Sequence, residues 1–204
     1  MTPRDIIQQA RYLTLDTDSV VPRQSDDELL SYVHEGLREA CLLRPDLFSA
    51  VGDMTCTPGQ CEQSITSLDA VRLLDVLSIH GSTALTPMDR QAMDLFRPSW
   101  RTDAEGPAKH WAPMEGDPLA FFIYPKAPTG QVLDVHYVRN PAEVAIDDVI
   151  VDLPVAYQPA LAWAVVHYAE SKDDEHVLSQ RAVMARQRFI EILRGGANGA
   201  TVPQ

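Results

Sequence analysis

The chain of 204 residues is poor in cysteine and has no long apolar run, and both absences restrict what kind of protein it is. Its three cysteines, Cys41, Cys56 and Cys61, are odd in number and too few for a disulfide framework, so we expect reduced thiols. No apolar run approaches the ~20 residues of a membrane span. The first residues lack the basic and apolar regions of a secretory signal. These absences predict a soluble chain that stays where it is made and has no membrane partner.

Cations are scarce as well, since 17 Lys and Arg stand against 29 Asp and Glu, for a formal net charge of -12 at pH 7. Nonspecific binding to DNA is driven by counterions that Lys and Arg release from phosphates, so this composition excludes a DNA-gripping role. The exception is the C-terminal region, where four arginines outnumber the single acid Glu191: Arg181, Arg186, Arg188 and Arg194. We interpret this region as a basic helix that faces an acidic neighbour, with an ordinary solvated face as the alternative.

The motifs of common catalytic and cofactor sites are missing too. The six histidines never form the i, i+4 pair with a glutamate that zinc hydrolases use, and Cys56 and Cys61 have no second pair at finger spacing. No serine lies in a G-x-S-x-G turn, and no glycine-rich phosphate loop is present. The sequence therefore predicts no catalytic residue, no metal ligand and no cofactor.

Two weaker constellations have simpler explanations than catalysis. Glu170 and Lys172 have the E-x-K spacing of some nucleases, with Asp46 as a conceivable partner, but all three are predicted at helix ends rather than on a sheet. We expect a solvated helix terminus there. Asp134 and His136 lie on one face of a predicted strand, where cross-strand polar pairing is a sufficient explanation.

The N-terminal region has clear helix signals. Thr2, Pro3 and Asp5 provide an N-cap, a first-turn proline and a first-turn acid for a helix to about residue 15. A capping box at residues 25–28 starts a second helix, which Pro45 ends.

The middle of the chain contains most of the glycines and prolines and is predicted to form a sheet. We expect a hairpin loop at residues 125–130 and a short helix at about residues 89–96. The expected strands cover residues 60–66, 72–80, 119–124 and 131–139.

Helical periodicity returns after Pro154 and continues to about residue 194. The predicted class is α+β, in which N- and C-terminal helices form one bundle and the middle is a β-rich insertion. The expected parts are residues 1–50, the insertion at 51–152, the C-terminal helices at 153–194 and an extended tail at 195–204.

Some of these residues are candidates for contacts with other proteins. Trp100 and Trp111 flank a polar stretch that we expect to be exposed, which is where aromatic side chains often meet partners. The tail is half glycine and alanine, and we expect it to become ordered only on docking. The candidate interface residues are Arg181, Arg188, Arg194, Trp100, Trp111, Val202 and Gln204.

Several segments in their order resemble one known family. They are Ser25 to Leu30 (SDDELL), Leu43 to Asp46 (LRPD), Tyr124-Pro125 with Pro128 to Val132, Tyr137 to Arg139 (YVR) and Ser171 to Glu175 (SKDDE). With the chain length and the helix-sheet-helix order, these segments resemble the head-to-tail adaptor proteins of short-tailed bacteriophages, also called tail tubular protein A or gatekeeper-like proteins.

The resemblance implies a structural virion protein and not an enzyme. It implies a homo-oligomeric ring, a dodecamer, that joins the portal protein to the tail nozzle protein. The ring would lie at the head-tail junction of the virion, and its subunits would be in the host cytoplasm before assembly. Genomic DNA would pass through the lumen without specific binding, and the acidic balance of the chain agrees with this. The alternatives are a host-encoded helical binding module and a metal-dependent nuclease.

Overall fold

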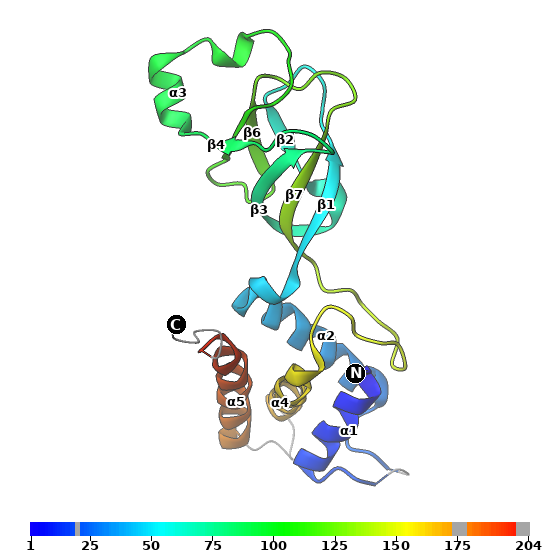
Figure 1. Cartoon of the computed structure of the whole chain (residues 1–204). Helices are drawn as coiled ribbons and strands as arrows, with labels where there is room; N and C mark the ends of the chain where they lie inside the picture. The colour runs from blue at the N-terminus through cyan, green and yellow to red at the C-terminus, as the bar shows by residue number, and fades with distance from the viewer. Residues whose placement is uncertain (19–20, 173–178, 199–204) are drawn as a thin grey trace, which may run out of the picture. The chain divides into compact units, whose positions relative to one another are not determined.

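The computed structural model describes residues 1–18, 21–172 and 179–198. The chain divides into two compact units, a helical unit of Met1–Phe48 with Pro141–Gln204, and a β unit of Ser49–Asn140 (Figure 1). The predicted α+β class is confirmed. Residues 141–152, which the sequence assigned to the insertion, group with the helical unit instead.

The helical unit contains four long helices, and local sequence explains where they start. Thr2 is the N-cap as predicted, and it also forms a capping box with Asp5. At the capping box predicted for residues 25–28, the Ser25 side chain accepts a hydrogen bond from the Glu28 backbone N–H. The Glu28 carboxylate itself accepts from Tyr32 and Lys172. The helices are α1 (Pro3–Thr14), α2 (Asp26–Leu43), α4 (Gln158–Glu170) and α5 (Ser179–Asn198).

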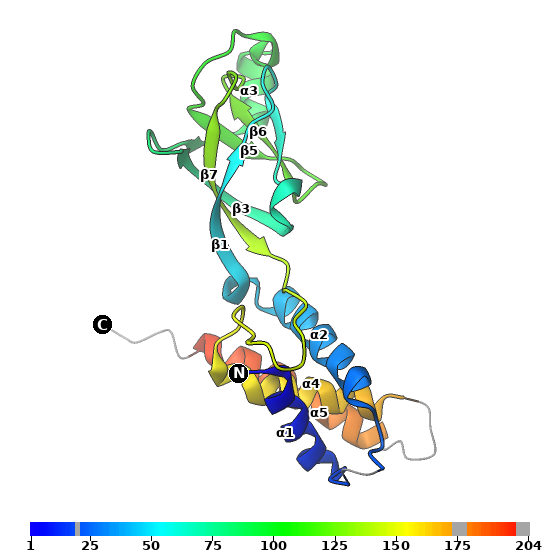
Figure 2. The same ribbon diagram turned by 90° about the vertical axis from the view of Figure 1, so that its right-hand side faces the viewer.

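Helix α4 is the centre of this unit. It packs against α1, α2 and α5, and Figures 1 and 2 both show α5 beside it. Because it is covered on several sides, α4 is apolar almost all round and has little amphipathic character. Gly36 of α2 allows the closest approach, since a Cβ built there would lie 2.9 Å from the Cβ of Ala164.

The β unit contains two small sheets. One has the strand order β1-β7-β3 and is antiparallel, and the other has the order β2-β6-β5-β4, with β4 parallel to β5. The strands are β1 (Ser49–Thr55), β2 (Glu62–Ser64), β3 (Ala70–Ile79), β4 (Thr86–Pro87), β5 (His110–Pro113), β6 (Ala120–Tyr124) and β7 (Val132–Arg139).

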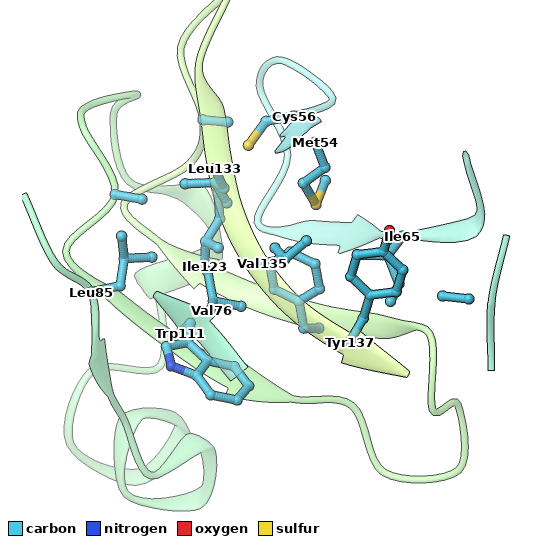
Figure 3. Packing of buried hydrophobic residues seen from close by; sticks show 14 residues of the cluster. Met54, Cys56, Ile65, Val76, Leu85, Trp111, Ile123, Leu133, Val135 and Tyr137 are labelled. Carbon is cyan, nitrogen blue, oxygen red and sulfur yellow. The ribbon is translucent and has the colours of Figure 1, made fainter. Parts of the chain in front are cut away.

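Side chains from both sheets form one apolar core (Figure 3). Strand β7 alternates as far as Tyr137, with Leu133, Val135 and Tyr137 in the core and Asp134 and His136 on the other face. The first sheet therefore has one face that is packed and one that is polar.

Short elements complete the fold. Helix α3 (Arg90–Phe96) begins after the N-cap Asp89, close to the predicted position. The 3-10 turns are η1 (Pro45–Phe48), η2 (Thr66–Leu68), η3 (Trp100–Thr102) and η4 (Val155–Tyr157).

Several local predictions were wrong. The segment at 125–130 is not a hairpin loop, because β6 and β7 belong to different sheets. Strands β1, β4 and β5 were not predicted. The tail is not extended from its start, since α5 continues to Asn198, while residues 199–204 lie outside the described residues.

Candidate interaction surfaces

Arg181 is one of the predicted interface residues, but it is bonded within its own chain. Its guanidinium donates to the backbone carbonyl of Leu13 and lies 3.9 Å from the carboxylate of Glu170. Its side chain is mostly buried. Arg181 therefore has partners within its own chain, and its predicted contact with an acidic neighbour stays a prediction.

Glu170 was expected to be a solvated residue at a helix end, and this is also wrong. Its side chain has no exposed area, and Arg23 Nη1 donates to Glu170 Oε1 over 3.1 Å. The carboxylate thus lies between two arginines, as a buried anion requires. Lys172 instead pairs with Glu28 and Asp46 with Arg44, so these residues do not assemble a nuclease site.

Two further arginines of α5, Arg188 and Arg194, are exposed. Arg188 is 61% exposed and forms an i, i+3 ion pair with Glu191 over 3.0 Å. Arg194 is exposed near the end of the described helix. Val183 and Met184 are also exposed on α5, so this surface combines apolar and basic side chains. Val202 and Gln204 lie outside the described residues.

The segment at 141–152 lies on the other side of α4 from α5 (Figure 1). It contains four acids and no Lys or Arg, and its exposed members include Glu143, Asp147 and Asp148. Val149 and Val151 are exposed beside them. Arg4 pairs with Asp147 and Arg38 with Glu143, which leaves the surface acidic but partly neutralised.

Trp100, a predicted partner-contact residue beside a stretch expected to be exposed, is itself buried. Its Nε1 donates to Asp94 over 2.8 Å, and the Arg101 guanidinium stacks 4.4 Å from its ring centroid. The hydrogen bond from Trp100, followed by that from Arg101, lowers the pKa of Asp94. Trp100 therefore anchors the loop after α3 and is not a free contact residue.

Trp111 is buried as well, in the apolar core between the two sheets (Figure 3). Its Nε1 has no hydrogen-bond partner among the described residues. Both tryptophans flank the stretch that was expected to be exposed, but they are buried themselves, so their predicted contact with a partner stays a prediction.

Sequence reasoning missed the exposed apolar surface of α3. None of the residues of this helix is buried, and Phe96 is 83% exposed beside Leu95. The only sequence signal was an apolar pair at the end of a short helix with charged neighbours. That pattern is equally typical of a helix that packs on its own core.

The polar face of the first sheet brings together three residues that the sequence did not connect. Asp134 was paired with His136 in the prediction, but its carboxylate bonds His80 Nδ1 over 2.7 Å and Ser78 Oγ over 2.5 Å. Asp53 lies across the sheet from Asp134, and its Oδ1 is 3.4 Å from His80 Nδ1. The predicted type of pairing is present with a different histidine.

Two further features are the state of the cysteines and the hydrophobicity of the helices. All three cysteines are free, as predicted, and all three are buried. Burial raises the pKa of the Cys56 and Cys61 thiols. Among the described residues, no helix is both long enough and apolar enough to cross a membrane.

Comparison with protein families decides the class of the protein. The SU10 adaptor protein family model matches residues 1–203. The chain belongs to the SU10 adaptor protein family. The predicted resemblance to the head-to-tail adaptors of phages is thereby confirmed, and the family is a structural class and not an enzyme class.

Two further comparisons accompany the family match. Among solved structures, this adaptor is similar to a chain in the neck of an empty GTA particle computed with C6 symmetry. The two chains are 17% identical, and the match covers 92% of the adaptor and 87% of the neck chain with a TM-score of 0.32. No curated protein matches the chain.

Proposed function

We propose that this adaptor forms a ring of twelve subunits that joins the portal to the tail nozzle and lets DNA pass. The observation that carries the proposal is the match of the adaptor family to residues 1–203, which is nearly the whole chain. The net charge of -12 supports a lumen that does not retain DNA, because the chain has few cations to neutralise phosphates.

The helical unit offers two different surfaces for contacts between subunits. The outer side of α5 has Arg188 and Arg194 beside exposed apolar residues, and the acidic segment at 141–152 lies on the other side of α4. A contact between two different surfaces of identical subunits is heterologous, and such contacts close into rings when the rotation permits. The charges of the two surfaces are opposite, which would offset the repulsion between acidic subunits.

The decisive experiment is electron microscopy with light-scattering mass, on this protein alone and mixed with the portal protein encoded nearest to it. We expect a ring added coaxially to the portal. If the two proteins do not associate at any salt concentration, the adaptor role at the portal is wrong.

Charge reversal tests the subunit contact. The double variant Arg188→Glu and Arg194→Glu should weaken ring formation at low salt, where surface charges are screened least. The double variant Arg72→Glu and Lys109→Glu makes the same change in net charge on two exposed cations of the β unit and is the matched control. Equal ring formation by the double variant and the control would remove α5 from the contact.

A separate proposal concerns Val202 and Gln204. They belong to the tail that is rich in glycine and alanine, and we propose, as the sequence suggested, that this tail contacts the portal. Removal of residues 199–204 should weaken portal binding and leave the thermal unfolding curve unchanged, and equal portal binding by the truncated protein would contradict this.

A further inference from the structure

Three potential metal ligands lie on the polar face of the β1-β7-β3 sheet. Asp53 belongs to β1, Asp134 to β7, and His80 directly follows β3. One ligand atom from each of the three lies within 4.8 Å of the others. The ladder hydrogen bonds of β1 and β7 hold Asp53 opposite Asp134, and the backbone N–H of His80 donates to the carbonyl of Val132 in β7.

The distances are close to those of a metal site. Two ligands of a tetrahedral Zn²⁺, each about 2.1 Å from the ion, lie about 3.4 Å apart. His80 Nδ1 and Asp53 Oδ1 are 3.4 Å apart. His80 Nδ1 and Asp134 Oδ1 are 2.7 Å apart, a hydrogen-bond distance that would have to open by about 0.7 Å. His80 is exposed and lies in the turn after β3, where such a movement is easy.

The electrostatics of this face also favour a cation. Asp53 and Asp134 are direct cross-strand partners, and like charges in that position repel each other. In the structure the His80 imidazole lies against both carboxylates. The hydrogen bond to Asp134 and the charge of Asp53 raise the pKa of His80, which reports the same attraction for positive charge.

Asp134 is held in place by a second side chain. Ser78 Oγ donates to Asp134 Oδ2, which leaves Oδ1 directed at His80. The hydrogen bond from Ser78 contributes most to lowering the pKa of Asp134, which favours the ionised carboxylate. A ligand that is oriented by a neighbouring hydrogen bond is a common feature of metal sites.

We propose that Asp53, His80 and Asp134 bind one divalent transition-metal ion of the Zn²⁺ type, with water in the remaining position. An imidazole with two carboxylates suits Zn²⁺ better than Mg²⁺ or Ca²⁺, which prefer oxygen ligands and more of them. The bound ion ties β1, β3 and β7 together on their exposed face and replaces the proton on His80. This inference does not depend on ring formation.

The test is calorimetric titration of Zn²⁺ into the full chain, repeated by competition with a chromogenic zinc indicator. We expect one saturable site per chain in the wild type. Asp53→Asn and His80→Gln should each weaken binding at least about tenfold. Both residues are exposed, so the variants should fold, and far-UV circular dichroism checks this.

His110→Gln is the matched control. His110 also lies in the β unit and bonds the Thr86 hydroxyl over 2.6 Å, but it is not one of the three ligands. The control should bind Zn²⁺ like the wild type. The proposal is overturned if the wild type has no saturable site, or if Asp53→Asn and His80→Gln bind as it does. It is also overturned if Mg²⁺ displaces Zn²⁺ at equal concentration, which would mean an unselective acidic surface.

Discussion

The helical unit and the β unit are stabilised in different ways. In the helical unit, helices surround α4, and a fully buried carboxylate, Glu170, lies between Arg23 and Arg181. In the β unit, an apolar core fills the space between two sheets, and the carboxylates of Asp53 and Asp134 lie on an outer face. Among the described residues, the charged side chains that are buried belong to the helical unit.

This difference indicates how each unit should respond to mutation. A buried ion pair adds little net stability but is costly to break, because the remaining charge stays without a partner. An apolar core loses stability in proportion to the volume removed. Each unit can therefore be weakened separately by its own kind of substitution.

The largest effect is expected for Phe121→Ala in the β unit. Phe121 has no exposed area, and its removal should lower the free energy of unfolding by about 3–5 kcal/mol. Hydrogen exchange should show faster exchange at Leu133 and Val135 while Val165 in α4 keeps its protection. Equal loss of protection in both units would mean that they unfold together.

The corresponding change in the helical unit is Glu170→Ala, which leaves Arg23 and Arg181 facing a buried gap. We expect a loss of about 3 kcal/mol or more, measured by denaturant unfolding, with faster exchange at Val165. Glu191→Ala removes an equally simple but exposed pair with Arg188 and should change stability by no more than about 0.5 kcal/mol. Similar losses in the two variants would contradict the burial of Glu170.

The helical unit was also the more predictable one. Its caps and apolar periodicity are local, so Thr2, Pro3 and Ser25 were sufficient to place two helix starts. Strand β1 was missed because its outer face is polar and its pairing with β7 joins residues far apart in sequence. The sequence also did not show that β6 and β7 belong to different sheets. A proline-rich loop is compatible both with a hairpin and with a connection from one sheet to the other.

The candidate site residues were harder to predict than the fold. Trp100 is covered by residues of α3 and β6, and Arg181 bonds a carbonyl of α1, neither of which local sequence can show. The grouping of Asp53, His80 and Asp134 depends on strand register. Period-two spacing correctly placed Asp134 on a polar face, but it could not identify the partner on the neighbouring strand.

A smaller change in stability is expected when either of two helical glycines, Gly36 or Gly195, is replaced by alanine. In Gly36→Ala the new Cβ would lie 2.9 Å from Ala164, so overpacking should outweigh the gain in helix propensity, with a net loss of up to about 2 kcal/mol. In Gly195→Ala no atom lies within 4 Å, so we expect a gain of about 0.5–1 kcal/mol. Thermal unfolding measures both. If both variants are stabilised, α2 and α4 do not approach as closely as the structure shows.

The smallest effect concerns pH and belongs to the β unit. The hydrogen bond to Asp134, and then the charge of Asp53, raise the pKa of His80 above its ordinary value of 6.5. The stability that protonated His80 contributes is fully present below pH 6.5 and is lost as the pH rises through the raised value. The stability difference between wild type and His80→Gln should therefore shrink as the pH rises from the ordinary pKa of 6.5 through the raised pKa of His80. Urea unfolding in chelator-treated buffer measures this without metal, and a difference that is flat or grows with pH would show that the two carboxylates do not act on the imidazole as described.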